Sequence, residues 1–121
     1  MGIVNRSGRR VRASVRVAFV GLNHELEGEV QTLDLSFSGC RGTCLSPPPV
    51  GTKLQMSVYL PGEESSLSIE LAVVRWVRKG FIGIQFCSIP SPHREQLHAW
   101  IMQAPYGRSQ EGLVKPCFMA A

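Results

Sequence analysis

The stretch Lys53-Leu54-Gln55-Met56-Ser57-Val58-Tyr59-Leu60 carries an apolar side chain at every second position. Because successive side chains of a β-strand point to opposite faces, this alternation predicts a strand with one buried face. The segment Pro61-Gly62-Glu63-Glu64 follows, and its composition is typical of a turn. After it, the run from Leu67 to Val73 alternates in the same way, so the two runs predict a pair of strands joined by that turn.

The same period of two recurs on both sides of this pair. It is found from Ser14 onward, again at about residues 25–35, and after the pair at residues 81–86. A short strand is expected at about residues 40–45. A loop must follow at residues 46–51, because three consecutive prolines cannot donate hydrogen bonds to a sheet. The sequence therefore predicts six short antiparallel strands.

The final element has a helical period instead. Ser91 is expected to cap a helix, with Pro92 at the first helical position. Three apolar residues then follow at a spacing that places them on one helical face: Leu97, Trp100 and Ile101. The expected fold class is mainly all-β, a six-stranded antiparallel barrel that is closed or nearly closed, with one C-terminal α-helix over one end.

A chain of 121 residues with 44% apolar content is long enough to form one compact domain. We expect a flexible arginine-rich arm at residues 1–12, the barrel and helix at residues 13–104, and an irregular tail at residues 105–121. No apolar run approaches the roughly 20 residues that span a bilayer, and no signal-peptide segment follows the first arginines, so we expect a cytoplasmic protein without membrane insertion. The cysteine spacing predicts no disulfide framework, and we expect Cys40 and Cys44 to be buried thiols.

Positive charge is concentrated near the N-terminus. The chain has 13 basic and 9 acidic residues, a net charge of +4, and its first acidic residue is Glu25. Such a local positive field implies an anionic partner or a solvated arm. One guanidinium group can donate two parallel hydrogen bonds to a phosphate, and it can also stack on a purine ring. An arm that contains arginine and no lysine therefore favours a planar ligand with phosphates. The arginines before Glu25 are Arg6, Arg9, Arg10, Arg12 and Arg16.

The stretch Asp34-Leu35-Ser36-Phe37-Ser38-Gly39 places a carboxylate, a hydroxyl and a glycine at the expected end of a strand. These residues suit a sharp turn, because Asp and Ser hydrogen-bond nearby amides and Gly tolerates positive φ. The carboxylate of Asp34 can also accept hydrogen bonds from the N1–H and the exocyclic amine of guanine, a pair that adenine lacks. We expect the side chains of Arg10 and Asp34 to be exposed and outside the core.

The order of these motifs resembles the PilZ domain family, the bacterial receptors for cyclic di-GMP. The segment Arg6-Ser7-Gly8-Arg9-Arg10 contains Arg-x-x-x-Arg, and two predicted strands later the stretch 34–39 reads Asp-x-Ser-x-x-Gly. The segment from Arg12 to Arg16 also satisfies the first pattern, but Arg16 falls within a predicted strand, which favours Arg6 and Arg10. The resemblance covers about residues 5–103 and implies the family's barrel with its terminal helix.

The resemblance implies that cyclic di-GMP is the ligand. From the layout of the chain we expect the arm to become ordered over the barrel face bearing Asp34 when the ligand binds, and so to signal to an effector protein. Trp76 resembles an aromatic residue near the ligand in some members, where it could stack on guanine. The ligand-binding residues expected on this basis are Arg6, Arg9, Arg10, Asp34, Ser36, Gly39 and Trp76.

Two other functions remain open. The first is a PilZ-like scaffold that acts through protein contacts without cyclic di-GMP, although the presence of both motifs argues against it. The second is a small basic barrel for single-stranded nucleic acid, which we do not expect because the arm contains no aromatic residue. We find no nucleophile motif and no zinc-type cysteine spacing, so we expect no catalytic residue, no metal site and no cofactor besides the ligand.

Overall fold

Seven strands and one helix make up residues 10–103, the part of the chain that this computed structural model describes. Every pair of neighbouring strands is antiparallel. The elements are β1 (Arg10–Arg12), β2 (Arg16–Gly21), β3 (Glu27–Ser36), β4 (Gly39–Thr43), β5 (Lys53–Tyr59), β6 (Leu67–Arg78), β7 (Phe81–Ser88) and α2 (His93–Gln103).

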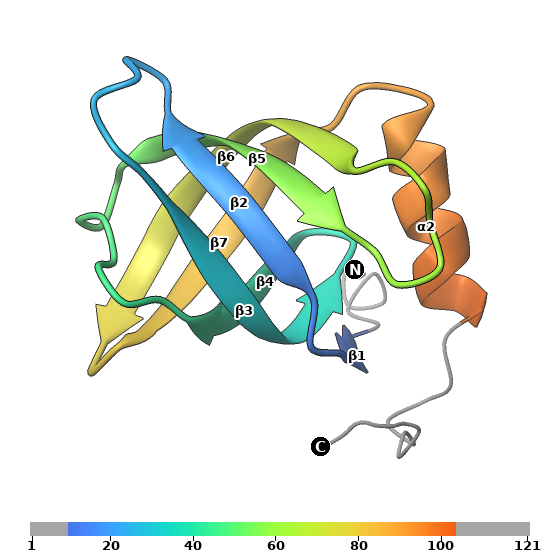
Figure 1. The fold of residues 1–121 in the computed structure, drawn as a ribbon, viewed down its shortest axis with the longest axis horizontal. Helices are drawn as coiled ribbons and strands as arrows, with labels where there is room; N and C mark the ends of the chain where they lie inside the picture. The colour runs from blue at the N-terminus through green and yellow to red at the C-terminus, as the bar shows by residue number, and fades with distance from the viewer. Residues whose placement is uncertain (1–9, 104–121) are drawn as a thin grey trace, which may run out of the picture.

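The six longer strands close into a barrel in the order β3, β2, β5, β6, β7 and β4 (Figure 1). Closure occurs because β3 pairs with β4 as well as with β2. The predicted six-stranded barrel with a C-terminal helix is therefore confirmed.

The short strand β1 is a departure from the prediction, because residues 10–12 were expected to belong to the flexible arm. The strand pairs with the end of β3 and places Val11 opposite Leu35, where both side chains are buried. Burial of an apolar side chain and a sheet hydrogen-bond partner together hold this segment on the barrel. The rest of the expected arm, residues 1–9, and the expected tail at residues 105–121 lie outside the described residues.

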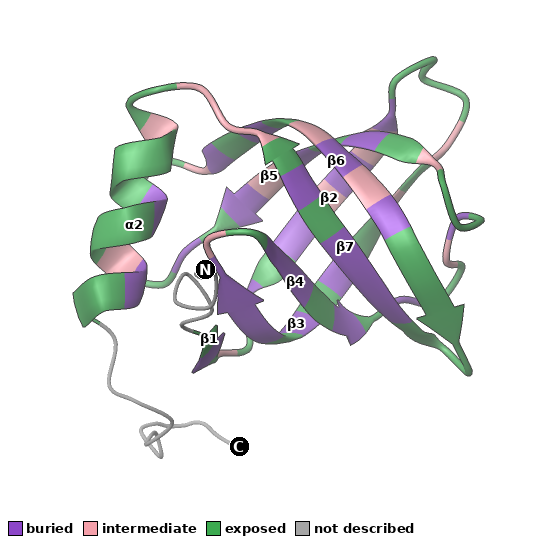
Figure 2. Cartoon of the chain, turned by 180° about the vertical axis from the view of Figure 1, so that it is seen from behind, coloured by how far each residue is buried: buried purple, intermediate pink, exposed green. Residues whose placement is uncertain are grey.

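The core follows the predicted alternation. In β5, Leu54, Met56 and Val58 are buried while the side chains between them face outward, and β2 alternates in the same way (Figure 2). The alternation is interrupted in β3 and β7, where residues 34–36 and 82–84 are buried in succession. Cys40 and Cys44 are buried and free, as expected.

Helix α2 lies at one end of the barrel, and the β6–β7 hairpin tip lies at the other end (Figures 1 and 2). Leu97 and Ile101 are buried against the core and Trp100 is half-buried, which confirms the predicted face. The expected start of the helix is wrong in detail, because the helix begins at His93 and not at Pro92. The Ser91 hydroxyl donates a hydrogen bond to the Glu95 carboxylate at 2.6 Å, and this bond lowers the pKa of Glu95. Within residues 10–103, no helix has the length and apolar character that a bilayer crossing requires.

Candidate functional site

Asp34 lies between two arginines on the outer face of the barrel. Its Oδ1 accepts from Arg10 Nη1 at 2.7 Å, and its Oδ2 accepts from Arg41 Nε at 2.6 Å. The Asp34 side chain is only 5% exposed, while those of Arg10 and Arg41 are 48% and 54% exposed. The expectation of an exposed carboxylate is therefore wrong, because the two guanidinium groups cover it.

Strand register brings this cluster together. In β3, Thr32 is buried before a register shift and Leu35 is buried after it, so the shift leaves Asp34 on the outer face. Across β4, Arg41 is the direct partner of Asp34, and across β1 the partner is Arg12, whose side chain is exposed.

Neither Arg12 nor Arg41 was among the predicted site residues. A signal for Arg41 was present in the sequence, because a tight turn over Ser36–Gly39 aligns position 34 with position 41. The signal for Arg12 was the second match to the arginine pattern, from Arg12 to Arg16. Its pairing with β3 could not be read from local sequence.

Ser36 and Gly39 shape the turn between β3 and β4. The buried Ser36 hydroxyl donates to the Gly39 carbonyl at 3.2 Å and accepts from the Ser38 amide at 3.2 Å. A Cβ at Gly39 would overlap the carbonyl oxygen of Ile84, so the close approach of β7 requires glycine there. The structure thus gives both residues a role in the turn, and their contact with a ligand stays a prediction.

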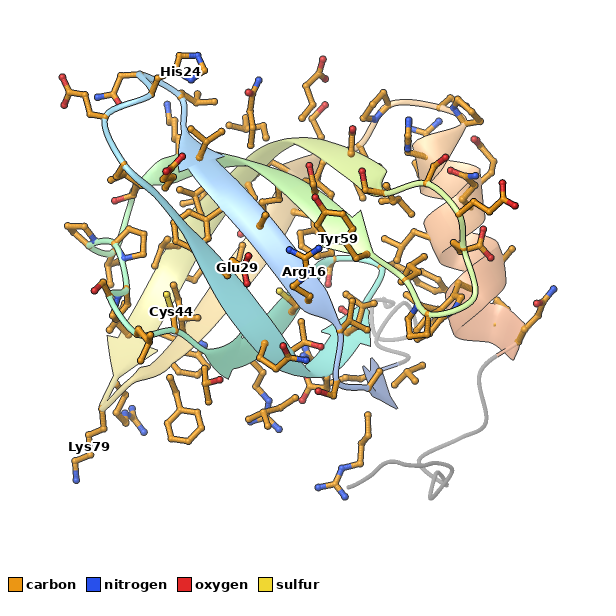
Figure 3. The ribbon with its side chains drawn as sticks, in the orientation of Figure 1. Arg16, His24, Glu29, Cys44, Tyr59 and Lys79 are labelled. Atoms are coloured by element: carbon orange, nitrogen blue, oxygen red, sulfur yellow. The ribbon has the colours of Figure 1, made fainter. Side chains whose placement is uncertain are left out.

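The predicted arginines have different positions. Arg10 contacts Asp34, whereas Arg6 and Arg9 lie outside the described residues. Arg16 is engaged elsewhere: its Nη1 lies 3.1 Å from Glu29 Oε2, and its guanidinium lies 4.0 Å from the centre of the Tyr59 ring (Figure 3). The pattern that ends at Arg16 therefore does not place that arginine at Asp34.

Trp76 lies in a shallow groove farther along the same outer face. A register shift between Val74 and Trp76 leaves both Arg75 and Trp76 exposed on β6, and the indole of Trp76 lies over Gly83 of β7. The groove has a volume of about 330 Å³ and is lined by Leu33, Arg41, Gly42, Trp76, Arg78, Lys79 and Phe81.

The cluster at Asp34 and this groove form one basic surface, because Arg41 belongs to both. Three cations and no acid line the groove, so its potential favours an anion, and its aromatic side chains favour a planar group. Behind the cluster, burial and then the negative charge of Asp34 raise the pKa of Cys40 to about 12, which keeps this thiol protonated and non-nucleophilic. Among residues 10–103, no group of three or more His, Cys, Asp or Glu side chains lies together in a way that could hold a metal ion.

Comparisons with known proteins agree with this architecture. The profile of the PilZ domain matches residues 5–103. The structure of the Bacillus subtilis inhibitor of motility (MotI/DgrA) is similar, with a TM-score of 0.63 and 20% sequence identity. The match covers 77% of this chain and 47% of that chain, so this chain spans about half the length of that protein. The PilZ domain of CeSA from a cellulose-synthesizing bacterium is similar with a TM-score of 0.61 and 16% identity, over 77% of this chain and 94% of that one. At these identities the two likenesses show the fold. No curated protein matches the chain.

Proposed function

Since the chain belongs to the PilZ domain family, a family of non-enzymatic domains that are generally cyclic di-GMP receptors, we propose that it binds cyclic di-GMP around Asp34. One observation supports this proposal above the others: Arg10 of the first motif lies 2.7 Å from Asp34 of the second motif. Twenty-four residues separate the two in the chain, and the barrel brings them to one point on its outer surface.

The chemistry of the surface matches the ligand, which carries two phosphates and two guanines. The guanidinium forks of Arg10 and Arg12 bind phosphate oxygens, and Asp34 accepts the N1–H and exocyclic amine of a guanine. Trp76 offers a face for the second guanine to stack on. Ser36 and Gly39 contribute by holding the turn that positions Asp34.

The proposed signal arises before β1. Because residues 10–12 already form a strand, the arm that closes over the ligand in this proposal is the segment that precedes Arg10. In this proposal Arg6 and Arg9 close over the ligand from that segment. The closed segment and the covered barrel face then form a new surface for an effector protein.

Calorimetry tests this proposal with a matched pair of variants. Cyclic di-GMP should bind the wild-type protein with micromolar affinity or better, whereas cyclic di-AMP should bind weakly because adenine cannot make the same pair of hydrogen bonds to Asp34. Arg10→Ala should lose about tenfold or more in affinity, the value of one charged hydrogen bond. Arg16→Ala removes an arginine of similar exposure that pairs with Glu29, and should bind as the wild type does. Equal affinities of the two variants, or equal binding of both dinucleotides, would contradict the proposal.

A second candidate function has one observation in its favour. We expected a nucleic-acid barrel to place aromatic side chains among its basic residues, and the groove places Trp76 and Phe81 beside Arg78 and Lys79. A titration with single-stranded oligonucleotides at several salt concentrations tests it. Binding whose affinity falls steeply with salt would favour this candidate, while no binding would remove it.

A further inference from the structure

We propose that Arg41 gates this site: it covers Asp34 in the free protein, and it exchanges that carboxylate for a ligand phosphate when guanine reaches Asp34. The inference rests on the proposed function, and it assigns both the closing of the site and a phosphate contact to a residue outside the two motifs. The contacts of Asp34 with its neighbours are the starting point.

Something must move before a guanine can reach Asp34. Each carboxylate oxygen already accepts a hydrogen bond from an arginine, and the side chain is only 5% exposed. Each carboxylate oxygen can accept more than one hydrogen bond, but a guanine can reach the carboxylate only after at least one of the two covering arginines has moved away. The two arginine side chains are half-exposed, so water can replace one ion pair at a modest cost.

Arg41 is better placed to move than Arg10. Its backbone is fixed in β4 between β3 and β7, but its side chain also lines the groove that contains Trp76. Arg10 does not line that groove, and its Cα partner is Ser36, farther along β3. A turn of the Arg41 side chain toward the groove therefore uncovers Asp34 and leaves the pairing of β1 unchanged.

Charge balance indicates what the displaced guanidinium binds. Guanine is neutral, so when it takes the carboxylate of Asp34 it leaves Arg41 without a counter-charge beside Arg78 and Lys79. A phosphate in the groove restores the balance through the fork of Arg41. Binding of the base and binding of the phosphate are then coupled, because the first releases the side chain that the second requires.

Calorimetry with cyclic di-GMP at low and high KCl tests the gate with three variants. Arg41→Ala should lose about tenfold or more in affinity through the missing phosphate contact, and its affinity should depend less on KCl. Arg41→Lys keeps the positive charge but loses the two-pronged guanidinium, so its affinity for cyclic di-GMP should lie between those of Arg41→Ala and the wild type. Arg75→Ala is the control: Arg75 lies on the same outer face and donates to Gln85 at 2.5 Å, but it does not line the groove, and the variant should bind as the wild type does. A thermal transition measured for each variant establishes that it is folded.

The outcomes separate this inference from the proposed function. If the wild type binds and Arg41→Ala binds equally well or more tightly, Arg41 only covers Asp34 and the exchange is wrong, while the proposed function stands. If Arg75→Ala loses as much affinity as Arg41→Ala, the general positive field accounts for the effect and the gate is again wrong. If calorimetry shows no binding of cyclic di-GMP to the wild type at either KCl concentration, both proposals fail.

Discussion

The ring of Phe37 is stacked on the imidazole of His98, with ring centres 4.7 Å apart and planes 13° apart. Phe37 belongs to the turn that follows Asp34, and His98 belongs to α2 at the end of the barrel. The helix therefore contacts the proposed ligand-binding stretch directly, and a displacement of the turn changes the surroundings of His98.

This contact predicts a remote response to the ligand. Cyclic di-GMP should shift the imidazole resonances of His98 in NMR spectra, because the ring current of Phe37 depends on the position of the turn. Phe37→Leu keeps an apolar side chain there but should reduce the shift strongly. His24, which lies in the exposed β2–β3 loop (Figure 3), should not respond in either protein. An undiminished shift of His98 in the variant would show that the stacked rings are not the route.

Asp34→Asn should lower the free energy of unfolding by about 1–3 kcal/mol, because a covered carboxylate loses its charge while two arginines depend on it. The control is Glu29→Gln, which weakens the exposed pair of Arg16 and Glu29, with side chains 49% and 58% exposed. That change should lower the free energy of unfolding by less than about 1 kcal/mol. Urea denaturation measures both values, and similar losses would mean that the burial of Asp34 has no energetic consequence.

Gly39→Ala separates two explanations of the glycine. If glycine is needed because β7 approaches closely, the added Cβ will meet the Ile84 carbonyl and lower the stability by about 1–3 kcal/mol. If glycine instead leaves room for the ligand, stability will be preserved and only the affinity for cyclic di-GMP will fall. We expect the first result, measured by urea denaturation and by calorimetry on the folded variant.

Alkaline pH should destabilise the protein partly through Cys40. Its pKa is about 12 in the fold, raised by burial and then by Asp34, against 9.0 for an ordinary thiol. Between these values the unfolded chain has released the thiol proton and the folded chain has not, so stability falls as pH rises above about 9 and is unaffected below it. The slope from this group approaches about 1.4 kcal/mol per pH unit. Urea denaturation at pH 8 to 11 should show a shallower decline for Cys40→Ala, and parallel declines would contradict this origin.

The barrel could be predicted from local sequence because its strands bury one face each. Alternation at residues 53–60 and in the neighbouring runs reports that burial directly, and the helical spacing of Leu97 and Ile101 does the same for α2. β1 could not be predicted this way, since a strand of three residues has one buried side chain, Val11, between two arginines. Its stability comes from pairing with the end of β3, where each partner residue lies more than twenty positions farther along the chain.

The site was predicted less completely than the fold. Asp34 and Arg10 were identified by motif, but their contact depends on how β1 pairs with β3. The covered state of Asp34 depends in addition on Arg41, which reaches the carboxylate from β4 after a shift of register. The register between strands is set by the closed sheet as a whole, so these contacts are only weakly indicated by the sequence.

Closure of the sheet also restricts how an effector protein could recognise this domain. Each of the six barrel strands has a neighbour on both sides, so most of its backbone amides and carbonyls are paired within the described part of the chain, and among the described strands β1, with three residues, pairs on one side only. A partner therefore cannot gain much by adding a β-strand of its own, the mode that open sheets offer. Discrimination between the empty and occupied forms would have to come from side-chain shape and charge on the outside of the barrel.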